Sequence, residues 1–428
     1  MCGWTRPECT PTPPCSAADE HRDPVGRLRH RTVRAAPATP RWRPSKAILA
    51  GYLGLALALT ALTALGARGA DLRAHRLLTG RPIDGWFRWD SGWYALIATK
   101  GYGYHPGHQS EVAFFPVYPM LVRAVSAVVG DVVVAGWLVT VTAGVATVLL
   151  FDQWLRGRVE PAARHLAVAA LMLYPYALFL YGAIYSDAVF LALVIAAFLL
   201  IERERWLLAG TIGALATACR PVGVALLVGL AVTILERHQG ATVRRSVTRR
   251  TLAPRTLPRT VLGPLLALVL AAGGLLSWML YLWWTVGDPL AFVHVQEAPG
   301  WGQAPGPRTW LKVAVVDHVR ARDSGHLLVL LPQAVAVLGA LALVPRVRSH
   351  LGWGYAAYTL TVLVIPLVGT KDFLGCGRYL LAAFPVFAVV GIELAAPRWR
   401  RHRAAVLTGS ALALGGLGYL WGAGVLLS

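Results

Sequence analysis

A short stretch of polar and aromatic residues interrupts an otherwise apolar chain. It contains Arg88-Trp89-Asp90, followed closely by Trp93 and Tyr94. Polar groups held beside a bilayer by aromatic anchors are costly to place, so a carboxylate there is a candidate for chemistry. It can take the proton from a hydroxyl group that attacks another molecule. We therefore expect Asp90 to be a catalytic base. The alternative is that it only caps a helix, and that the aromatic residues form an interfacial belt.

The residues after Asp90 predict a short helix that ends near Gly101, because glycine commonly terminates helices. Trp89, Trp93 and Ile97 recur every four residues along this segment. Side chains at that spacing share one helix face. The pattern predicts an apolar stripe that lies on the membrane surface.

Three further charged residues stand at the edges of apolar segments. Arg220 precedes a proline between two such segments, Asp187 opens another, and Arg378 begins a late one. A guanidinium group at a helix break suits a phosphate, because its planar fork contacts two oxygens at once. For Arg220 the alternative is snorkelling or an internal ion pair. Asp187 is either a helix N-cap or a second carboxylate of the same site, and Arg378 either a phosphate contact or a headgroup anchor.

Gln296 and Trp301 lie in a second polar stretch and have the amide and indole groups typical of sugar contacts, although an aromatic belt is the plainer interpretation. The chain has no phosphate-binding loop, no dinucleotide fingerprint and no histidine pair at metal spacing. Cys219 and Cys376 stand alone, and no cysteine pair has zinc-ligand spacing. We therefore assign no metal, no cofactor and no nucleotide-sugar donor.

Composition indicates an integral membrane protein. Hydrophobic residues make up 56% of the 428 residues, charged residues only 14%, and the mean hydropathy is +0.54. One soluble core cannot bury so much apolar surface. The net charge of +20 could indicate nucleic acid. The arginines instead cluster between apolar segments, so we expect membrane lipids and no nucleic acid as partners.

Two regions follow from the hydropathy pattern. Residues 1–46 predict a disordered basic cytosolic tail, and they lack the pattern of a cleaved signal peptide. The alternative is that this stretch precedes the true start of the protein. Residues 47–428 predict an all-α, multi-spanning membrane domain with about 11 transmembrane helices. The expected spans are 47–67, 132–151, 166–182, 187–201, 206–218, 221–235, 261–286, 326–344, 351–370, 378–396 and 404–427.

The distribution of Lys and Arg predicts the orientation. With the N-terminus inside and 114–129 taken as a re-entrant or tilted short helix, inside segments hold 27 of the 41 basic residues. The 237–259 loop holds seven of these. A full span at 114–129 would move the basic residues of 152–165 outside, which the positive-inside rule disfavours. The outer loops are then 68–131 and 287–325.

Taken in order, these motifs resemble the GPI mannosyltransferase II (PIG-V-like) family within the GT-C superfamily of polyprenyl-phosphate-sugar-dependent glycosyltransferases. The matches run from about residue 47 to 396, and the blocks before residue 120 contribute most of them. They are Arg88-Trp89-Asp90 with Tyr94, Ile97-Ala98 and Gly101-Tyr102, Ala-Phe-Phe-Pro-Val-Tyr-Pro at 113–119, Tyr185-Ser186-Asp187, Cys-Arg-Pro-Val-Gly at 219–223, Phe292 to Gln296 with Trp301, and Arg378-Tyr379 with Phe384-Pro385.

The resemblance implies an inverting transfer of mannose from polyprenyl-phosphate-mannose to a lipid-linked or envelope glycan acceptor on the non-cytosolic face. It makes Asp90 the catalytic carboxylate and Glu111 the acidic residue before the aromatic block. The motif at Asp187 reads Tyr-Ser-Asp where Tyr-Ser-Glu is commoner, which puts the secondary carboxylates in doubt but not Asp90. The arginine-rich, lysine-poor chain indicates a bacterial plasma-membrane protein, so the acceptor would be an envelope glycan or glycolipid.

Two other classes of function remain open. One is a transporter or flippase for a lipid-linked sugar, with Arg220 and Asp187 along the translocation path. The other is a non-catalytic subunit of an envelope-synthesis complex. Catalysis requires Asp90 to share a site with Arg220 and Arg378, whereas transport requires polar residues throughout the membrane depth.

Overall fold

The computed structural model describes residues 45–69, 77–246, 259–303 and 305–427, all within one compact unit of the chain. The 1–44 tail and most of the 237–259 loop, with the predictions made for them, lie outside the described residues. The described part is helical and contains no β-strand, only an isolated bridge between Arg156 and Val159. The all-α prediction is confirmed.

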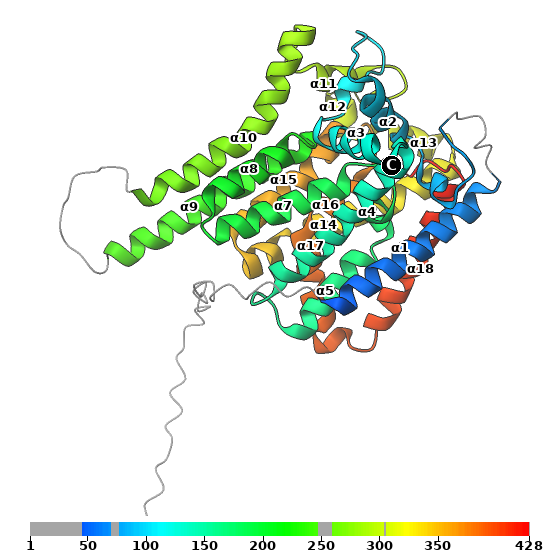
Figure 1. Ribbon diagram of the computed structural model, residues 1–428. Helices are drawn as coiled ribbons and strands as arrows, with labels where there is room; N and C mark the ends of the chain where they lie inside the picture. The colour runs from blue at the N-terminus through cyan, green and yellow to red at the C-terminus, as the bar shows by residue number, and fades with distance from the viewer. Residues whose placement is uncertain (1–44, 70–76, 247–258, 304, 428) are drawn as a thin grey trace, which may run out of the picture. The chain divides into compact units, whose positions relative to one another are not determined.

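Within the described residues, five helices are long and apolar enough to cross a membrane, which indicates an integral membrane protein by length and composition. They pack against shorter helices (Figure 1). The five are α1 (Lys46–Ala67), α4 (Val132–Leu155), α10 (Arg259–Val286, apolar from Leu262), α14 (Ser324–Leu351) and α18 (Arg403–Gly422). The remaining helices are α2 (Ser91–Lys100), α3 (Val117–Val129), α5 (Pro161–Met172), α6 (Leu178–Tyr181), α7 (Asp187–Glu202), α8 (Trp206–Thr217), α9 (Val224–Ser246), α11 (Ala291–His294), α12 (Pro307–Trp310), α13 (Val313–Arg320), α15 (Trp353–Gly369), α16 (Cys376–Ala382) and α17 (Phe384–Ala395).

Two segments expected as single spans are sharply bent. The 166–182 segment is built from α5 and a second piece, Pro175–Tyr181, at 67°, and the 378–396 segment from α16 and α17 at 82°. Pro175 and Pro385 mark both breaks, because proline lacks the N–H that continues a helix and disfavours helical backbone in the residue before it. Counting each bent pair as one span gives seven candidates among the described residues, so eleven spans are not confirmed.

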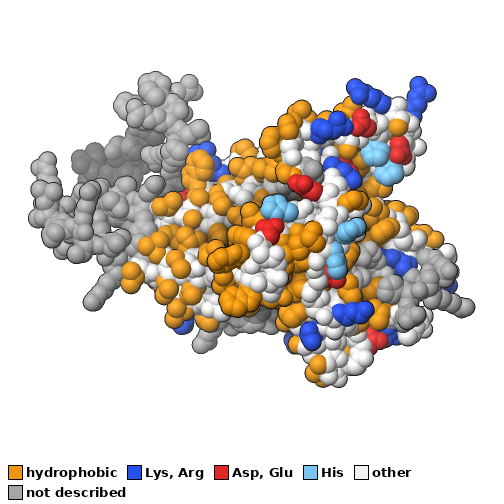
Figure 2. Space-filling model, turned by 90° about the horizontal axis from the view of Figure 1, so that it is seen from above, with side chains coloured by type: hydrophobic (Ala, Val, Ile, Leu, Met, Phe, Trp, Pro, Cys, Tyr) orange, Lys and Arg blue, Asp and Glu red, His pale blue; other side chains and the backbone are white. Residues whose placement is uncertain are grey.

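Large apolar side chains lie on the outside of the helices. Leu57 is 73% exposed, Val128 86% and Trp284 88%. Figure 2 shows the same property on one face, where hydrophobic side chains dominate and charged side chains gather at a few places. Exposed apolar surface of this extent is costly in water and is normal against lipid.

Helix α18 packs along α1, and both contact the 3₁₀ turn Pro82–Trp86 (Figure 1). Gly66 of α1 and Gly422 of α18 lie directly against the backbone of the opposite helix, so any side chain at either position would clash. Small residues allow this close approach of membrane helices. The contact fixes the carbonyl groups at the end of α18 next to residues 86–89.

The short helix predicted after Asp90 is confirmed as α2, with Gly101 as its C-cap at φ 89°. The predicted stripe is wrong, however. Trp89 precedes the helix with φ 51°, and Ile97 is fully buried. Ile97 instead belongs to the face that packs into the protein. The short apolar helix within 114–129 is present as α3, with 13 residues.

Candidate active site

Asp90 occupies the N-cap position of α2, but its carboxylate does not cap the helix. Its backbone is in the helical region, at φ −60° and ψ −15°, and its side chain makes no capping hydrogen bond. The carboxylate turns instead to Arg378, whose Nη1 lies 3.2 Å from Oδ2. The Asp90 N–H donates to the hydroxyl of Tyr185 at 3.0 Å. The interpretation of Asp90 as a helix cap only is therefore wrong.

The backbone just before Asp90 is strained. Trp89 has φ 51°, in the left-handed region that residues with a Cβ rarely adopt. Such a conformation costs on the order of 1–3 kcal/mol, and positions of this kind concentrate at functional sites. The Trp89 indole N–H donates to the Val425 carbonyl at 3.3 Å, which holds this conformation.

Asp187 and Arg220 form a second ion pair next to the first. The N-cap of α7 is Ser186, so Asp187 is the first residue of the helix; it pairs directly with Arg220 at the break between α8 and α9. The Arg220 and Asp187 side chains are only 7% and 5% exposed. For Arg220, the structure thus has the internal ion pair that was the alternative to a phosphate contact.

Arg378 joins the two pairs into one cluster. Its Nε lies 4.0 Å from Asp187 Oδ2, while its Nη1 contacts Asp90. That Nε atom and Asp187 Oδ2 are both buried without a hydrogen-bond partner. Arg378 is only 11% exposed, so it is no headgroup anchor. Four charged groups from four separate chain segments therefore meet, with two polar atoms still unsatisfied.

Aromatic rings enclose the two guanidinium groups. Arg378 lies 5.0 Å from the centre of the Tyr185 ring, and Arg220 lies 5.0 Å from that of Tyr379. Cation–π contacts of this kind stabilise a guanidinium group that has lost its water. Tyr94 closes the cluster through a 2.9 Å hydrogen bond with the Ser186 hydroxyl. Phe179 and Phe190 complete the ring contacts of Arg378 and Arg220.

Asp90 is the most accessible member of the cluster. Its side chain is 28% exposed, whereas those of Arg378, Arg220 and Asp187 are nearly buried. Burial raises the pKa of Asp90 above the ordinary carboxyl value, and the nearby Arg378 only partly opposes this effect. A carboxylate with a raised pKa is a stronger base than a free one. The site thus presents a basic, reachable carboxylate in front of two buried cations.

The structure does not bring Arg88 and Trp89 into the cluster. The Arg88 guanidinium donates to the carbonyl groups of Trp421 (3.2 Å) and Gly422 at the end of α18. Cationic side chains commonly satisfy the free carbonyls at a helix C-terminus. Arg88 and Trp89 thus attach the loop to α18, and their expected contact with substrate has no support here.

Two of the other expected site residues, Trp93 and Trp301, lie in a separate aromatic cluster. The Trp93 ring lies 5.8 Å from that of Trp301 and 5.9 Å from that of Phe114, so the segments at 93–114 and around residue 301 meet there. The Gln296 side chain donates to the Phe292 carbonyl, at 3.5 Å. Glu111 lies beside Gly103 at the start of a single 3₁₀ turn.

Sequence reasoning found the four charges but not the groups that hold them. Tyr185 lies two residues before Asp187, and Tyr379 directly follows Arg378; this closeness in sequence was the available signal. Phe179 and Phe190 resemble any other apolar residue of a span. Only their position against the guanidinium groups distinguishes them.

No protein-family model matches this chain, and no curated protein matches it. Among solved structures, it is similar to the oligosaccharyltransferase of Archaeoglobus fulgidus in the apo form, at 13% identity and a TM-score of 0.43. That match covers 87% of this chain and 55% of the other. It is also similar to a structure of the archaeal oligosaccharyltransferase AglB from Archaeoglobus fulgidus in complex with an inhibitory peptide and a dolichol-phosphate, at 13% identity and a TM-score of 0.45. That match covers 88% of this chain and 55% of the other. This chain thus spans about half the length of the structures it matches.

Proposed function

We propose that this chain is a membrane mannosyltransferase of GT-C type that moves mannose from polyprenyl-phosphate-mannose to a lipid-linked or envelope glycan acceptor. The observation that supports it best is the convergence of Asp90, Asp187, Arg220 and Arg378 at the edge of the first outer loop. A base in front of buried guanidinium groups suits a reaction in which a hydroxyl attacks and a phosphate leaves.

In the proposed reaction, the acceptor hydroxyl approaches Asp90. Without substrate, Arg378 contacts Oδ2 of Asp90. Once Arg378 turns to the donor phosphate, a carboxylate oxygen of Asp90 takes the proton. The acceptor oxygen bonds to C1 of mannose while the bond from C1 to the phosphate oxygen breaks, and that oxygen leaves with the electron pair. A single displacement inverts the configuration at C1.

The guanidinium groups act on the leaving phosphate. Negative charge grows on it as the bond breaks, and contacts that strengthen with this charge lower the barrier. Arg378 is the better placed of the two arginines, because its Nε is buried without a hydrogen-bond partner. A lipid phosphate that reaches the cluster would satisfy that atom.

The sugar and the acceptor rest on weaker support. Mannose, the polyprenyl carrier and the outer-face location come from the sequence resemblance given above. The Trp93–Trp301 cluster supports a sugar-binding surface, because aromatic faces are common platforms for planar or amphipathic ligands. Glu111 and Gln296, together with Tyr94, remain candidate contacts along the same loops.

The proposal is tested with the purified chain in lipid vesicles, labelled polyprenyl-phosphate-mannose and envelope glycolipid acceptors. The expected result is covalent transfer that Asp90→Asn abolishes. The matched control is Asp288→Asn, because Asp288 is also an outer-loop carboxylate but contacts only His294 and the Leu290 backbone. Movement of the label across the vesicle membrane without covalent transfer would instead support a transporter and refute the proposal.

A further inference from the structure

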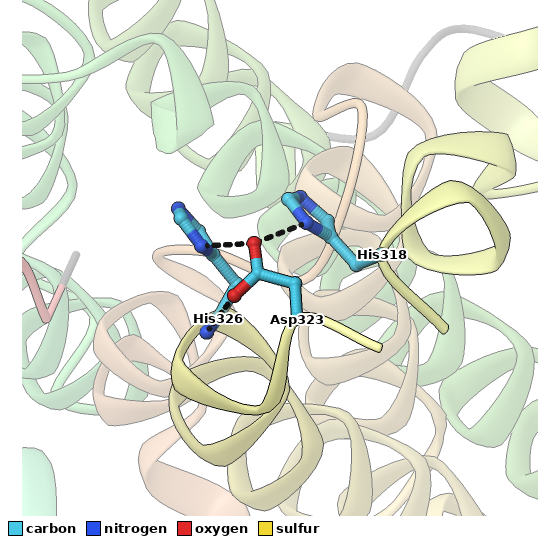
Figure 3. Close-up of side chains that lie close together, drawn as sticks. All are labelled: His318, Asp323 and His326. Atoms are coloured by element: carbon cyan, nitrogen blue, oxygen red, sulfur yellow. Dashed lines mark hydrogen bonds and ion pairs between the residues drawn. The ribbon is translucent and has the colours of Figure 1, made fainter. Parts of the chain in front are cut away.

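A second cluster of titratable side chains lies in the other outer region. His318 near the end of α13, Asp323 in the turn and His326 at the start of α14 converge, and their possible ligand atoms all lie within 4.8 Å of one another. Figure 3 shows both imidazole rings directed at the same carboxylate. This cluster shares no residue with the one around Asp90.

The backbone fixes the position of the carboxylate. Asp323 is the N-cap of α14, and its Oδ1 accepts from the His326 N–H at 3.2 Å. The chain reaches it through Arg322, which has φ 54°. Because the cap uses Oδ1, Oδ2 is directed at the two rings. It lies 3.2 Å from Nδ1 of His318 and 2.7 Å from Nδ1 of His326.

One of the two separations is close to the edge length of a tetrahedral metal site, and the other is shorter. Zinc binds imidazole nitrogen and carboxylate oxygen at about 2.0–2.2 Å, which places neighbouring ligand atoms about 3.3–3.6 Å apart. The distance from Asp323 Oδ2 to His318 Nδ1, 3.2 Å, is close to this range. The distance from Asp323 Oδ2 to His326 Nδ1, 2.7 Å, must lengthen by less than an ångström. The rings are stacked, 13° apart with centroids 4.6 Å apart, so one ring must rotate to bring both Nδ1 lone pairs to the same ion.

The donor set selects the kind of ion. Two imidazoles and one carboxylate suit zinc and similar transition-metal ions, whereas calcium and magnesium prefer oxygen ligands alone. The side chains of His318, Asp323 and His326 are 27%, 35% and 67% exposed, which leaves room for water in the fourth position. Sequence spacing gave no signal, because seven residues and a helix boundary separate the histidines.

We propose that His318 Nδ1, His326 Nδ1 and Asp323 bind one divalent transition-metal ion of the zinc type, with water as the fourth ligand. The ion replaces the protons that now lie between the rings and the carboxylate. It clamps α13 to the start of α14, so this membrane helix and the outer loop move together. This site does not depend on the proposed transfer reaction.

Metal binding to the purified full chain in detergent tests the proposal. The affinity tag is removed, and Cys2, Cys9 and Cys15 are replaced by serine, because thiolates bind zinc as well. Titration with Zn²⁺ by calorimetry should give one equivalent, and Co²⁺ should give the visible absorption of a tetrahedral complex. Zn²⁺ should also raise the melting temperature, since it binds only the folded site.

Variants separate this site from adventitious binding. His318→Ala and Asp323→Asn should each weaken binding by more than about tenfold, the smallest loss expected even for an outer-sphere partner. Asparagine still caps the helix, so Asp323→Asn should remain folded. His294→Ala is the matched control, because His294 pairs with Asp288 in the same outer region without a second histidine. No binding by the parent chain, or equal binding by parent and His318→Ala, would overturn the proposal.

Discussion

Loss of one partner of the Arg220–Asp187 pair should destabilise the protein strongly. In Asp187→Leu, Arg220 loses its closest anion while its side chain remains only 7% exposed. Breaking a buried ion pair from one side costs about 3–5 kcal/mol, because the remaining charge stays buried and uncompensated. No discount for solvent screening applies at such low exposure. Arg220→Met should cost a similar amount, since it leaves Asp187 Oδ1 without its cation.

The double variant should recover most of this loss. Apolar residues of similar volume often replace a buried ion pair at little cost, so Asp187→Leu with Arg220→Met should approach wild-type stability. The double-mutant cycle should therefore give a coupling energy of several kcal/mol between the two positions. The matched control is the Arg308–Asp317 pair, whose side chains are 84% and 54% exposed. Its disruption should have almost no effect.

The assay is thermal unfolding in detergent, followed by transfer activity measured on the same samples. We expect the double variant to be folded but inactive, because the site then lacks a carboxylate and a guanidinium group. Single variants as stable as wild type would refute the inference that the pair is buried and mutually compensating. A stable and fully active double variant would remove both residues from the proposed reaction.

The remaining predictions concern catalysis and orientation. Asp90→Asn should abolish transfer while expression and insertion stay normal, because the Asp90 side chain makes no capping hydrogen bond; wild-type turnover would rule out its role as base. Transfer should decline as pH falls through the raised pKa of Asp90, since only the ionised carboxylate accepts a proton. Arg378→Gln removes a cation that lowers this pKa, so the decline should move to higher pH. An unchanged pH profile would contradict the contact between Arg378 and Asp90. Arg220→Lys should impair transfer because lysine lacks the planar fork, and a fully active variant would exclude a phosphate contact. In intact cells, His108→Cys should react with an impermeant label and Ser349→Cys should not; the reverse pattern would overturn the orientation.

The sequence was sufficient to predict helices but not how they bend. Long apolar runs and the glycine at position 101 correctly gave α1, α4 and the short helix α2. The expected spans at 166–182 and 378–396 counted apolar residues alone. The proline in each was a visible signal of a break, but the bend angles of 67° and 82° depend on packing against other helices.

The candidate site was likewise only partly predictable from the sequence. The residue types of Asp90, Asp187, Arg220 and Arg378 at the edges of apolar segments marked each as unusual. Their pairing was not visible, because Asp90 and Arg378 are 288 residues apart and only tertiary packing brings them together. For Arg88, the motif predicted a contact with substrate, but its guanidinium group interacts with the carbonyl groups at the end of α18. No local sequence pattern predicts the position of that helix.

Charge balance explains how this cluster suits a substrate with a phosphate group. Two carboxylates and two guanidinium groups sum to zero, so the cluster is compensated without substrate. A phosphate adds negative charge, and an arginine must then exchange partners. Arg378 is the better candidate, because its 3.2 Å contact is with the partly exposed Asp90, whereas Arg220 and Asp187 are both nearly buried. In the proposed reaction, the phosphate draws Arg378 away and leaves Asp90 without the cation that lowers its pKa. The carboxylate thus becomes a stronger base only when the donor is in place, which couples donor binding to activation of the base.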